Sequence, residues 1–133
     1  MVTREDLESF LIRMDVDYEE LEEGLFLVQS KTNGAPIVVH YSQPLLLVRL
    51  KVIDLPSDDA GLFDLYKHLL ELNATDVVHG AYGIEDGELI LSDTLELETL
   101  DFHELQSSAE SIALAASGHL EVIKSLMGSP VEG

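Results

Sequence analysis

The hydrophobic pattern is clearest in the second half of the chain, where it predicts a helix, a β-hairpin and a long helix. Residues 62–73 repeat apolar positions at helical spacing. Residues 77–97 alternate around Asp86-Gly87, a dipeptide that favours a two-residue hairpin turn. Residues 101–127 carry one apolar stripe, again at helical spacing. This half therefore predicts packing surfaces and shows no reaction centre.

The first half predicts one helix and then three strands. Thr3 with Asp6 gives a capping-box start signal. One helical face then carries Leu7, Phe10, Leu11 and Met14, and Asp15-Val16-Asp17 ends the helix. The predicted strands are residues 18–30 (Tyr18–Leu21 leading through Glu22-Glu23-Gly24 into Leu25–Ser30), Pro36–Tyr41 and Leu45–Ile53.

Turn and capping residues mark the remaining boundaries. Lys31-Thr32-Asn33-Gly34 predicts a hairpin turn, because Asn-Gly tolerates positive φ. Pro56-Ser57-Asp58-Asp59 predicts the start of the second helix, with Ser57 or Asp58 as N-cap and Asn73 as C-cap. Asp101 with Glu104 predicts a capping box for the last helix. The order is α-β-β-β-α-β-β-α, with a single domain over 1–127 and a flexible tail over 128–133.

The composition narrows the classes of partner. Hydrophobic residues make up 46% of the 133 residues, which excludes a disordered chain. Seven basic residues against 26 acidic ones give a net charge of −19, which argues against nucleic acid and anionic membranes and favours a partner with basic segments. Cysteine is absent, the charged N-terminus lacks a signal sequence, and no apolar run is long enough to span a membrane, so we expect a cytoplasmic protein.

The second predicted helix is apolar over a wide arc. Its apolar positions cover about 180° of the helical wheel, although one core contact needs only about 100°. The surplus predicts a second apolar contact such as a homodimer mate, and the alternative is a deep groove within one chain. The candidate dimer residues are Leu62, Leu65, Leu69 and Leu72, or Phe63 and Leu70 if the wheel is turned the other way.

The strand over 45–53 is also apolar on both faces. Leu46, Val48, Leu50 and Val52 share one parity, and Leu45, Leu47, Arg49, Lys51 and Ile53 share the other. A sheet with one face in water should alternate cleanly, so the second face is either a docking surface for an apolar peptide or is covered by helices or a dimer partner. The candidate partner-binding residues are Phe10, Leu11, Met14, Arg49 and Lys51.

The search for chemistry finds no catalytic or metal motif. Asp15-x-Asp17-x-Glu19 starts like a calcium-binding loop but has Glu20 where the loop needs glycine. Gly80-Ala81-Tyr82-Gly83 lies inside a strand pattern, which indicates a bulge or a close backbone approach. The five histidines show no metal-ligand spacing and are read as surface residues. We therefore expect no catalytic residues, no metal and no cofactor.

Several segments resemble a known family. They are Leu69-Leu70-Glu71-Leu72-Asn73, Gly80 to Leu91 (GAYGIEDGELIL), Leu95 to Asp101 (LELETLD) and the long last helix. Together with the order of elements they resemble the class I type III secretion chaperone fold of the CesT/Tir-chaperone-like superfamily, and especially its YbjN-like branch of bacterial sensory transduction regulators. The resemblance implies an α+β fold, with a twisted antiparallel sheet packed against helices, a homodimer and no catalysis.

The function expected from residues and resemblance is protein binding. The first hypothesis is a non-enzymatic, chaperone-like homodimer that binds a segment of an unknown protein partner. The second is a regulatory or adaptor domain that uses the same surfaces for a folded partner. An enzyme is least favoured, because the sequence supplies no convergent set of titratable residues.

Overall fold

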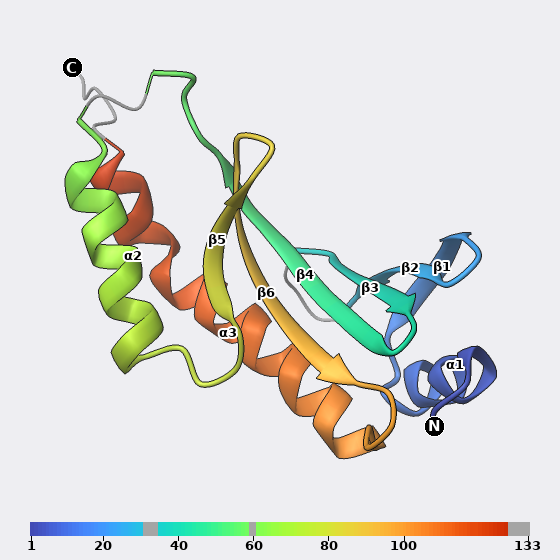
Figure 1. The fold of residues 1–133 in the computed structure, drawn as a ribbon. Coiled ribbons are helices and arrows are strands. Elements are labelled where there is room, and N and C mark those ends of the chain that lie inside the picture. The colour runs from blue at the N-terminus through green and yellow to red at the C-terminus, as the bar shows by residue number, and fades with distance from the viewer. Residues whose placement is uncertain (31–34, 59–60, 128–133) are drawn as a thin grey trace.

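One antiparallel sheet with helices packed against it forms the framework of the protein (Figure 1). The structure is a computed structural model that describes residues 1–30, 35–58 and 61–127. Within them the elements are α1 (Arg4–Arg13), β1 (Asp17–Glu22), β2 (Leu25–Gln29), β3 (Ile37–Ser42), β4 (Leu45–Asp54), α2 (Phe63–Thr75), β5 (Ala81–Glu85), β6 (Glu88–Glu96) and α3 (Phe102–Leu126). The predicted α+β class and the antiparallel sheet are confirmed.

The sheet has the strand order β1-β2-β3-β4-β6-β5, and all neighbouring strands are antiparallel. Strands that follow one another in the chain are neighbours in the sheet, except β4 and β5. Strand β4 pairs instead with β6, and β5 lies at the edge beyond it. The hairpin predicted at Asp86-Gly87 is confirmed: both residues have positive φ, 51° and 77°, as a two-residue turn of this type requires.

The predicted order of elements was one strand short. The segment 18–30 is two antiparallel strands, because the chain reverses at Glu23-Gly24, where Gly24 has a φ of 82°. The turn residues Glu22-Glu23-Gly24 are visible in the sequence, but their short spacing is also compatible with a single bent strand. The predicted turn at 31–34 and the predicted tail at 128–133 lie outside the described residues.

Both predicted capping boxes are confirmed. The Thr3 hydroxyl accepts a hydrogen bond from the Asp6 amide at 3.1 Å, and the Asp6 carboxylate accepts one from the Thr3 amide at 3.0 Å. These bonds hold the pKa of Asp6 below its usual value. Asp101 and Glu104 make the same reciprocal pair at the start of α3. Each box satisfies amides that a helix leaves unpaired at its N-terminus.

The predicted ends of α2 were wrong. The helix starts at Phe63 rather than at Ser57 or Asp58, and its N-cap, Leu62, makes no side-chain cap. Asn73 lies inside the helix, and its side chain bonds the backbone of Tyr82 on β5, accepting from the amide at 2.8 Å and donating to the carbonyl at 3.4 Å. The asparagine therefore ties α2 to the outer edge of the sheet, a role that its sequence position does not reveal.

The hydrophobic core lies between the helices and one face of the sheet. The largest side chains with almost no exposed surface come from all three helices, from four of the strands and from the connection after β6: Leu7, Leu11, Phe26, Val39, Leu46, Leu65, Leu89, Leu91, Leu97, Leu105, Ile112 and Ile123. Burial at this level stabilises by about 2 kcal/mol per side chain before the entropy of ordering is subtracted. The buried Ser108 donates to the Asp93 carboxylate at 2.8 Å, so its hydroxyl is satisfied.

Candidate protein-binding surfaces

One face of the sheet has no helix packed on it within the described residues. On β4 the buried Leu46, Val48 and Leu50 point into the core, while Leu45 and Leu47 point the other way and are half-buried. The strand register places the same alternation on β2, β3 and β6. The half-buried aliphatic side chains that share this opposite face and do not pack against the core are Leu25, Leu27, Val38, Leu45, Leu47 and Ile90, and we call this surface the open face.

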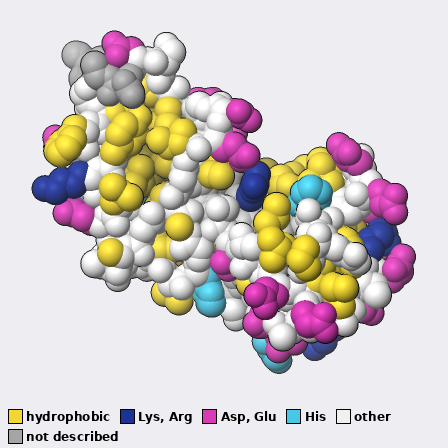
Figure 2. All heavy atoms as spheres, in the orientation of Figure 1, with side chains coloured by type: hydrophobic (Ala, Val, Ile, Leu, Met, Phe, Trp, Pro, Cys, Tyr) yellow, Lys and Arg dark blue, Asp and Glu magenta, His cyan; other side chains and the backbone are white. Residues whose placement is uncertain are grey.

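The open face extends over four neighbouring strands, and polar or charged residues stand between some of its aliphatic side chains. Leu27 on β2 lies beside Val38 on β3, and Leu47 on β4 lies beside His40 on β3. Directly opposed antiparallel residues have their Cβ atoms about 5 Å apart, so these side chains cover one another in part. Figure 2 shows hydrophobic side chains gathered over this region and, separately, over α2.

Arg49 and Lys51 lie among the side chains of the open face, opposite Val38 and Ile90, and are held by carboxylates. The Arg49 guanidinium donates to Glu85 at 2.8 Å across the sheet. The Lys51 ammonium lies 2.9 Å from Asp54 and 3.3 Å from Glu88, and the hydrogen bond to Asp54 is the main reason that its pKa is raised. Two of the seven basic residues thus neutralise acidic side chains beside an aliphatic surface.

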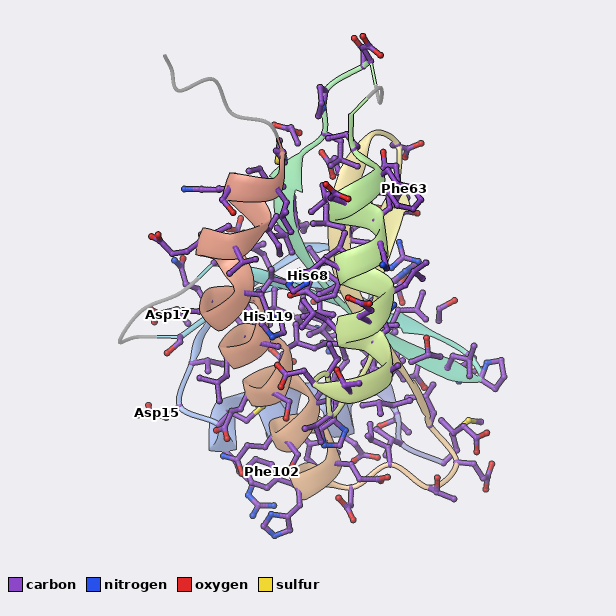
Figure 3. All side chains as sticks on the ribbon, turned by 90° about the vertical axis from the view of Figure 1, so that its left-hand side faces the viewer. Asp15, Asp17, Phe63, His68, Phe102 and His119 are labelled. Carbon is purple, nitrogen blue, oxygen red and sulfur yellow. The ribbon has the colours of Figure 1, made fainter. Side chains whose placement is uncertain are left out.

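The structure corrects the predicted dimer face of α2. Leu62, Leu65 and Leu69 are at most 5% exposed and pack in the core, and Leu72 is half-buried against it. The outward residues are Phe63 and Leu70, 74% and 69% exposed, as in the alternative orientation of the wheel. Figure 3 shows Phe63 pointing away from α3. The wheel alone could not tell the two faces apart, because both are apolar.

The predicted partner-binding residues do not form one surface. Leu11 is fully buried, so it cannot contact a partner, and we withdraw it from the set. Phe10 and Met14 are half-buried on α1, where Phe10 meets Phe102 edge-on at 6.1 Å between ring centroids. Helix α1 covers the core side of the sheet, whereas Arg49 and Lys51 lie at its open face. The role of Phe10 and Met14 in partner binding stays a prediction.

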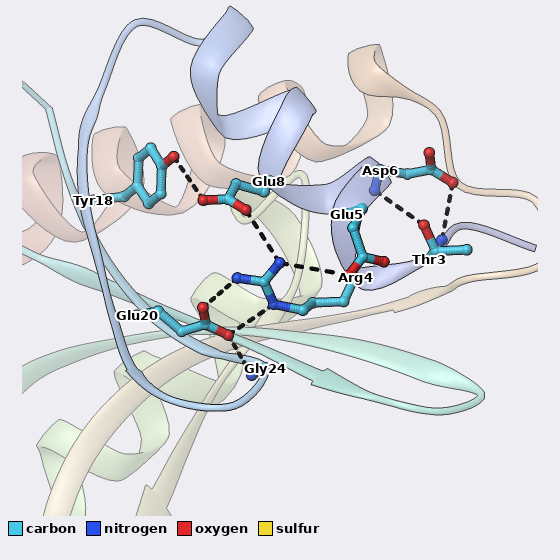
Figure 4. Close-up of polar contacts among 8 residues, drawn as sticks. All are labelled: Thr3, Arg4, Glu5, Asp6, Glu8, Tyr18, Glu20 and Gly24. Carbon is cyan, nitrogen blue, oxygen red and sulfur yellow. Dashed lines mark hydrogen bonds and ion pairs between the residues drawn. The ribbon is translucent and has the colours of Figure 1, made fainter.

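A polar network fixes α1 to the first hairpin (Figure 4). The Arg4 guanidinium forms an ion pair with Glu20 on β1, bonding it through two nitrogens, and also bonds Glu8 at 3.1 Å. Glu8 accepts a further bond from the Tyr18 hydroxyl at 3.0 Å, which raises the pKa of Tyr18. Glu20 also accepts from the Gly24 amide at 2.8 Å. One side chain, Glu20, therefore links the helix to the turn that separates β1 from β2.

This network makes the attachment of α1 sensitive to acid. The bond from Arg4, and next the bond from Gly24, lower the pKa of Glu20 to about 2, whereas an unfolded glutamate titrates at about 4.3. The unfolded chain binds the proton more readily, so the pair stabilises the fold above about pH 5, and this contribution is lost as pH falls toward about 2.

We expect Glu20→Gln to flatten the loss of stability in this pH range, as measured by urea unfolding at several pH values. The exposed neighbour Glu19 offers the matched control, Glu19→Gln, which should keep the wild-type pH slope. Equal slopes for the two variants would show that the Arg4–Glu20 pair does not set the acid response.

The next observations concern metal-ligand groups, membrane-spanning helices and the histidines. No group of three or more metal-ligating side chains occurs among residues 1–30, 35–58 and 61–127. None of the helices in the described part of the chain has the length and hydropathy that crossing a bilayer requires. His119, predicted to be a surface residue, is instead largely covered and bonds Asp76 and Tyr82. Its partners lie 43 and 37 residues away in the chain, so sequence spacing could not reveal them.

Comparison with known proteins identifies the family. Residues 2–128 match the family model CesT_Tir_1, so the chain belongs to the CesT_Tir_1 family. A search of curated protein sequences gives no match. The resemblance to the CesT/Tir chaperone-like superfamily is thus confirmed at the level of the family, and the YbjN-like branch stays a prediction.

Solved structures share the fold. A chain of the heterodimeric ExoU–SpcU complex from the type III secretion system of Pseudomonas aeruginosa is similar with a TM-score of 0.72, 14% identity, and coverage of 90% of this chain and 98% of that one. The Yersinia pestis type III secretion chaperone SycH, solved in complex with a fragment of YscM2, is similar with a TM-score of 0.62, 18% identity, and coverage of 87% of this chain and 98% of that one. The crystal structure of YbjN from E. coli is similar with a TM-score of 0.66, 14% identity, and coverage of 92% of this chain and 92% of that one.

At these identities the likeness is one of fold. The protein has a type III secretion chaperone-like fold, and the similar structures include chains solved in complex with a partner protein or with a fragment of one. The open face and the outer face of α2 are therefore the surfaces to examine for binding.

Proposed function

We propose that this protein is a non-enzymatic, chaperone-like binding protein that holds a segment of a partner protein on the open face of its sheet. The observation that carries the proposal is a set of half-buried aliphatic side chains on four strands, interspersed with His40, Arg49 and Lys51, on a face that no helix of the described residues covers. A surface of this kind gains free energy when a partner removes it from water, at about 25 cal/mol per Å² of apolar area.

The shape and charge of the open face favour an extended segment with some basic residues. A sheet surface presents flat rows of side chains rather than a closed pocket, so it suits a chain whose own apolar residues lie along it. The net charge of −19 favours a partner of opposite charge and speeds its approach. Arg49 and Lys51 are held in ion pairs on this face, beside Val38 and Ile90, where they can meet carboxylates or carbonyls of the partner.

We further propose a homodimer formed through the outer face of α2, defined by Phe63 and Leu70. The two side chains lie two helical turns apart and are the most exposed large apolar residues of α2. An aromatic and a leucine side chain at the centre of a small interface are typical anchors of association.

The alternative is a regulatory or adaptor domain of the YbjN-like type that binds a folded partner. The likeness to YbjN, which covers 92% of both chains, supports it. The same open face would then contact a preformed surface, and the two functions differ in the state of the partner.

Partner capture from native lysate by the full chain tests the proposal. We expect Leu47→Asp on the open face to weaken capture more than tenfold, since a buried anchor contributes about 2 kcal/mol or more. The matched control is Val122→Asp, because Val122 is 44% exposed on α3 and outside both surfaces. Equal capture by both variants, with both folded, would reject the open face. Digesting the captured partner separates the functions: a retained short fragment supports chaperoning, and retention of only the intact domain supports the adaptor.

A further inference from the structure

An open cleft runs along α3 on the part of the molecule that the open face does not use. It encloses about 340 Å³, which is at the lower end of the size of ligand pockets. The lining residues are Asp76, Val78, Ser111, Leu114, Ala115, Gly118 and His119. Most of this lining is apolar or small, and the two groups that carry charge or titrate, Asp76 and His119, stand together.

Asp76 is held in place by a chain of hydrogen bonds. The His119 Nε2 atom lies 2.5 Å from one carboxylate oxygen of Asp76, and the His119 Nδ1 atom lies 2.7 Å from the Tyr82 hydroxyl. When His119 is neutral, Tyr82 donates to Nδ1 and Nε2–H donates to Asp76, so all three groups are satisfied. Burial, and next the charge of Asp76, raise the pKa of Tyr82 to about 12, which keeps its hydroxyl protonated as the donor. Figure 3 shows His119 on α3 on the side toward α2.

The arrangement leaves a negative charge at the edge of an apolar cleft. The Asp76 side chain is 61% exposed, whereas the imidazole that holds it is only 13% exposed. Val78 and Leu114 are 81% and 76% exposed beside it, far more than apolar residues that pack within the chain. Lys124 is the single basic residue other than histidine within α3, against Glu104, Glu110 and Glu121. A cation with an aliphatic stem therefore suits this cleft, because the charge can meet Asp76 and the stem can contact the apolar wall.

We propose that the cleft binds an arginine side chain of a partner protein, with the guanidinium on Asp76 and the aliphatic stem against Val78 and Leu114. Arginine fits better than lysine for two reasons. Its planar guanidinium presents several donors to a carboxylate, and it is less strongly hydrated, so it loses less on entering a cleft with apolar walls. This site is separate from the open face, and it goes beyond the proposed function by assigning a second contact.

Nuclear magnetic resonance titration of the full chain tests the proposal. The probe is N-acetylarginine N-methylamide, and the matched ligand is the citrulline analogue, which has nearly the same shape without the charge. We expect saturable shifts of the amide signals of Val78, Leu114 and Gly118 with the arginine probe and none with citrulline. Equal shifts with the two probes, or none at the cleft, would overturn the proposal without any variant.

Two variants locate the charge. Asp76→Asn keeps an acceptor for His119 and removes the carboxylate charge, and we expect it to weaken the arginine probe about tenfold, as loss of a charge-assisted hydrogen bond predicts. Glu121→Gln removes the same charge from α3 outside the cleft and should change the affinity less than about twofold. Equal effects of the two would assign the binding to the general field of the protein and reject the site. Leu47→Asp should leave this titration unchanged, so failure here does not bear on the open face.

Discussion

Replacing Leu69 with aspartate is expected to unfold the protein, whereas the same change at Leu70 should leave it folded. Leu69 is 5% exposed and belongs to the core, and Leu70, the next residue on α2, is 69% exposed. Losing the buried leucine costs about 2–5 kcal/mol, and placing a carboxylate there adds its desolvation. Domains have a total stability of only about 5–15 kcal/mol, so little would remain. Leu70→Asp should change stability by about 0.5 kcal/mol or less.

The pair also tests the proposed homodimer. We expect Leu70→Asp to give monomers, because it places two like charges opposite each other in an apolar contact. Urea unfolding followed by circular dichroism measures stability, and solution scattering measures the mass. A Leu70→Asp protein with the mass of a wild-type dimer would rule out α2 as the interface, and a monomeric wild type would remove the dimer altogether. A folded Leu69→Asp protein would contradict the assignment of the two faces of α2.

Replacing Gly80 with alanine is expected to cause the largest loss of stability among the glycines near the β5–β6 hairpin. Gly80 has a φ of 85°, and a Cβ there would lie 2.2 Å from the backbone carbonyl oxygen of Ser92 on the neighbouring strand. Because the clashing atom belongs to the sheet, it cannot move aside as a side chain could. The strained φ and the forced displacement together should cost about 3–5 kcal/mol.

Two other glycines of the same hairpin separate these causes. Gly87 has a φ of 77° but open space around it, so Gly87→Ala should cost about 1 kcal/mol for the left-handed conformation alone. Gly83 lacks both the positive φ and the close neighbour, so Gly83→Ala should change stability by about 0.5 kcal/mol or less. Urea unfolding of the three variants ranks them. A Gly80→Ala protein as stable as Gly83→Ala would contradict the close approach of the two strands.

The sequence alone does not distinguish Gly80 from Gly83. The pattern around Gly80 and Gly83 predicts a bulge or a close backbone approach, but it does not indicate at which of the two glycines this occurs. Of these two glycines, only Gly80 has the close approach, since the pairing that sets Ser92 opposite Ala81 brings the Ser92 carbonyl beside Gly80. A contact between residues 12 positions apart depends on the register of the hairpin, which the alternation of side chains limits and the whole sheet decides.

Local patterns in the sequence determined most of the helices and strands, and they carried the resemblance to the family. The capping boxes at Thr3 and Asp101 and the turn at Asp86-Gly87 involve residues at most three positions apart, so their hydrogen bonds and dihedral angles follow from neighbouring side chains. The alternation on β4 was likewise readable, including the presence of a second apolar face. Errors arose where a boundary lacked a local signal, as at the start of α2, where no side chain caps the helix.

Tertiary structure decided which apolar surfaces are buried and which polar groups meet. Hydrophobic residues look alike in sequence, so only packing shows that Leu69 fills the core while Leu70 faces outward. Packing also shows that the helices cover one face of the sheet and leave Leu25, Leu27 and Leu47 on the other. Asp76, Tyr82 and His119 come together because β5 and the end of α2 pack beside α3. Burial and long-range contact depend on how whole elements pack, and no local spacing encodes that.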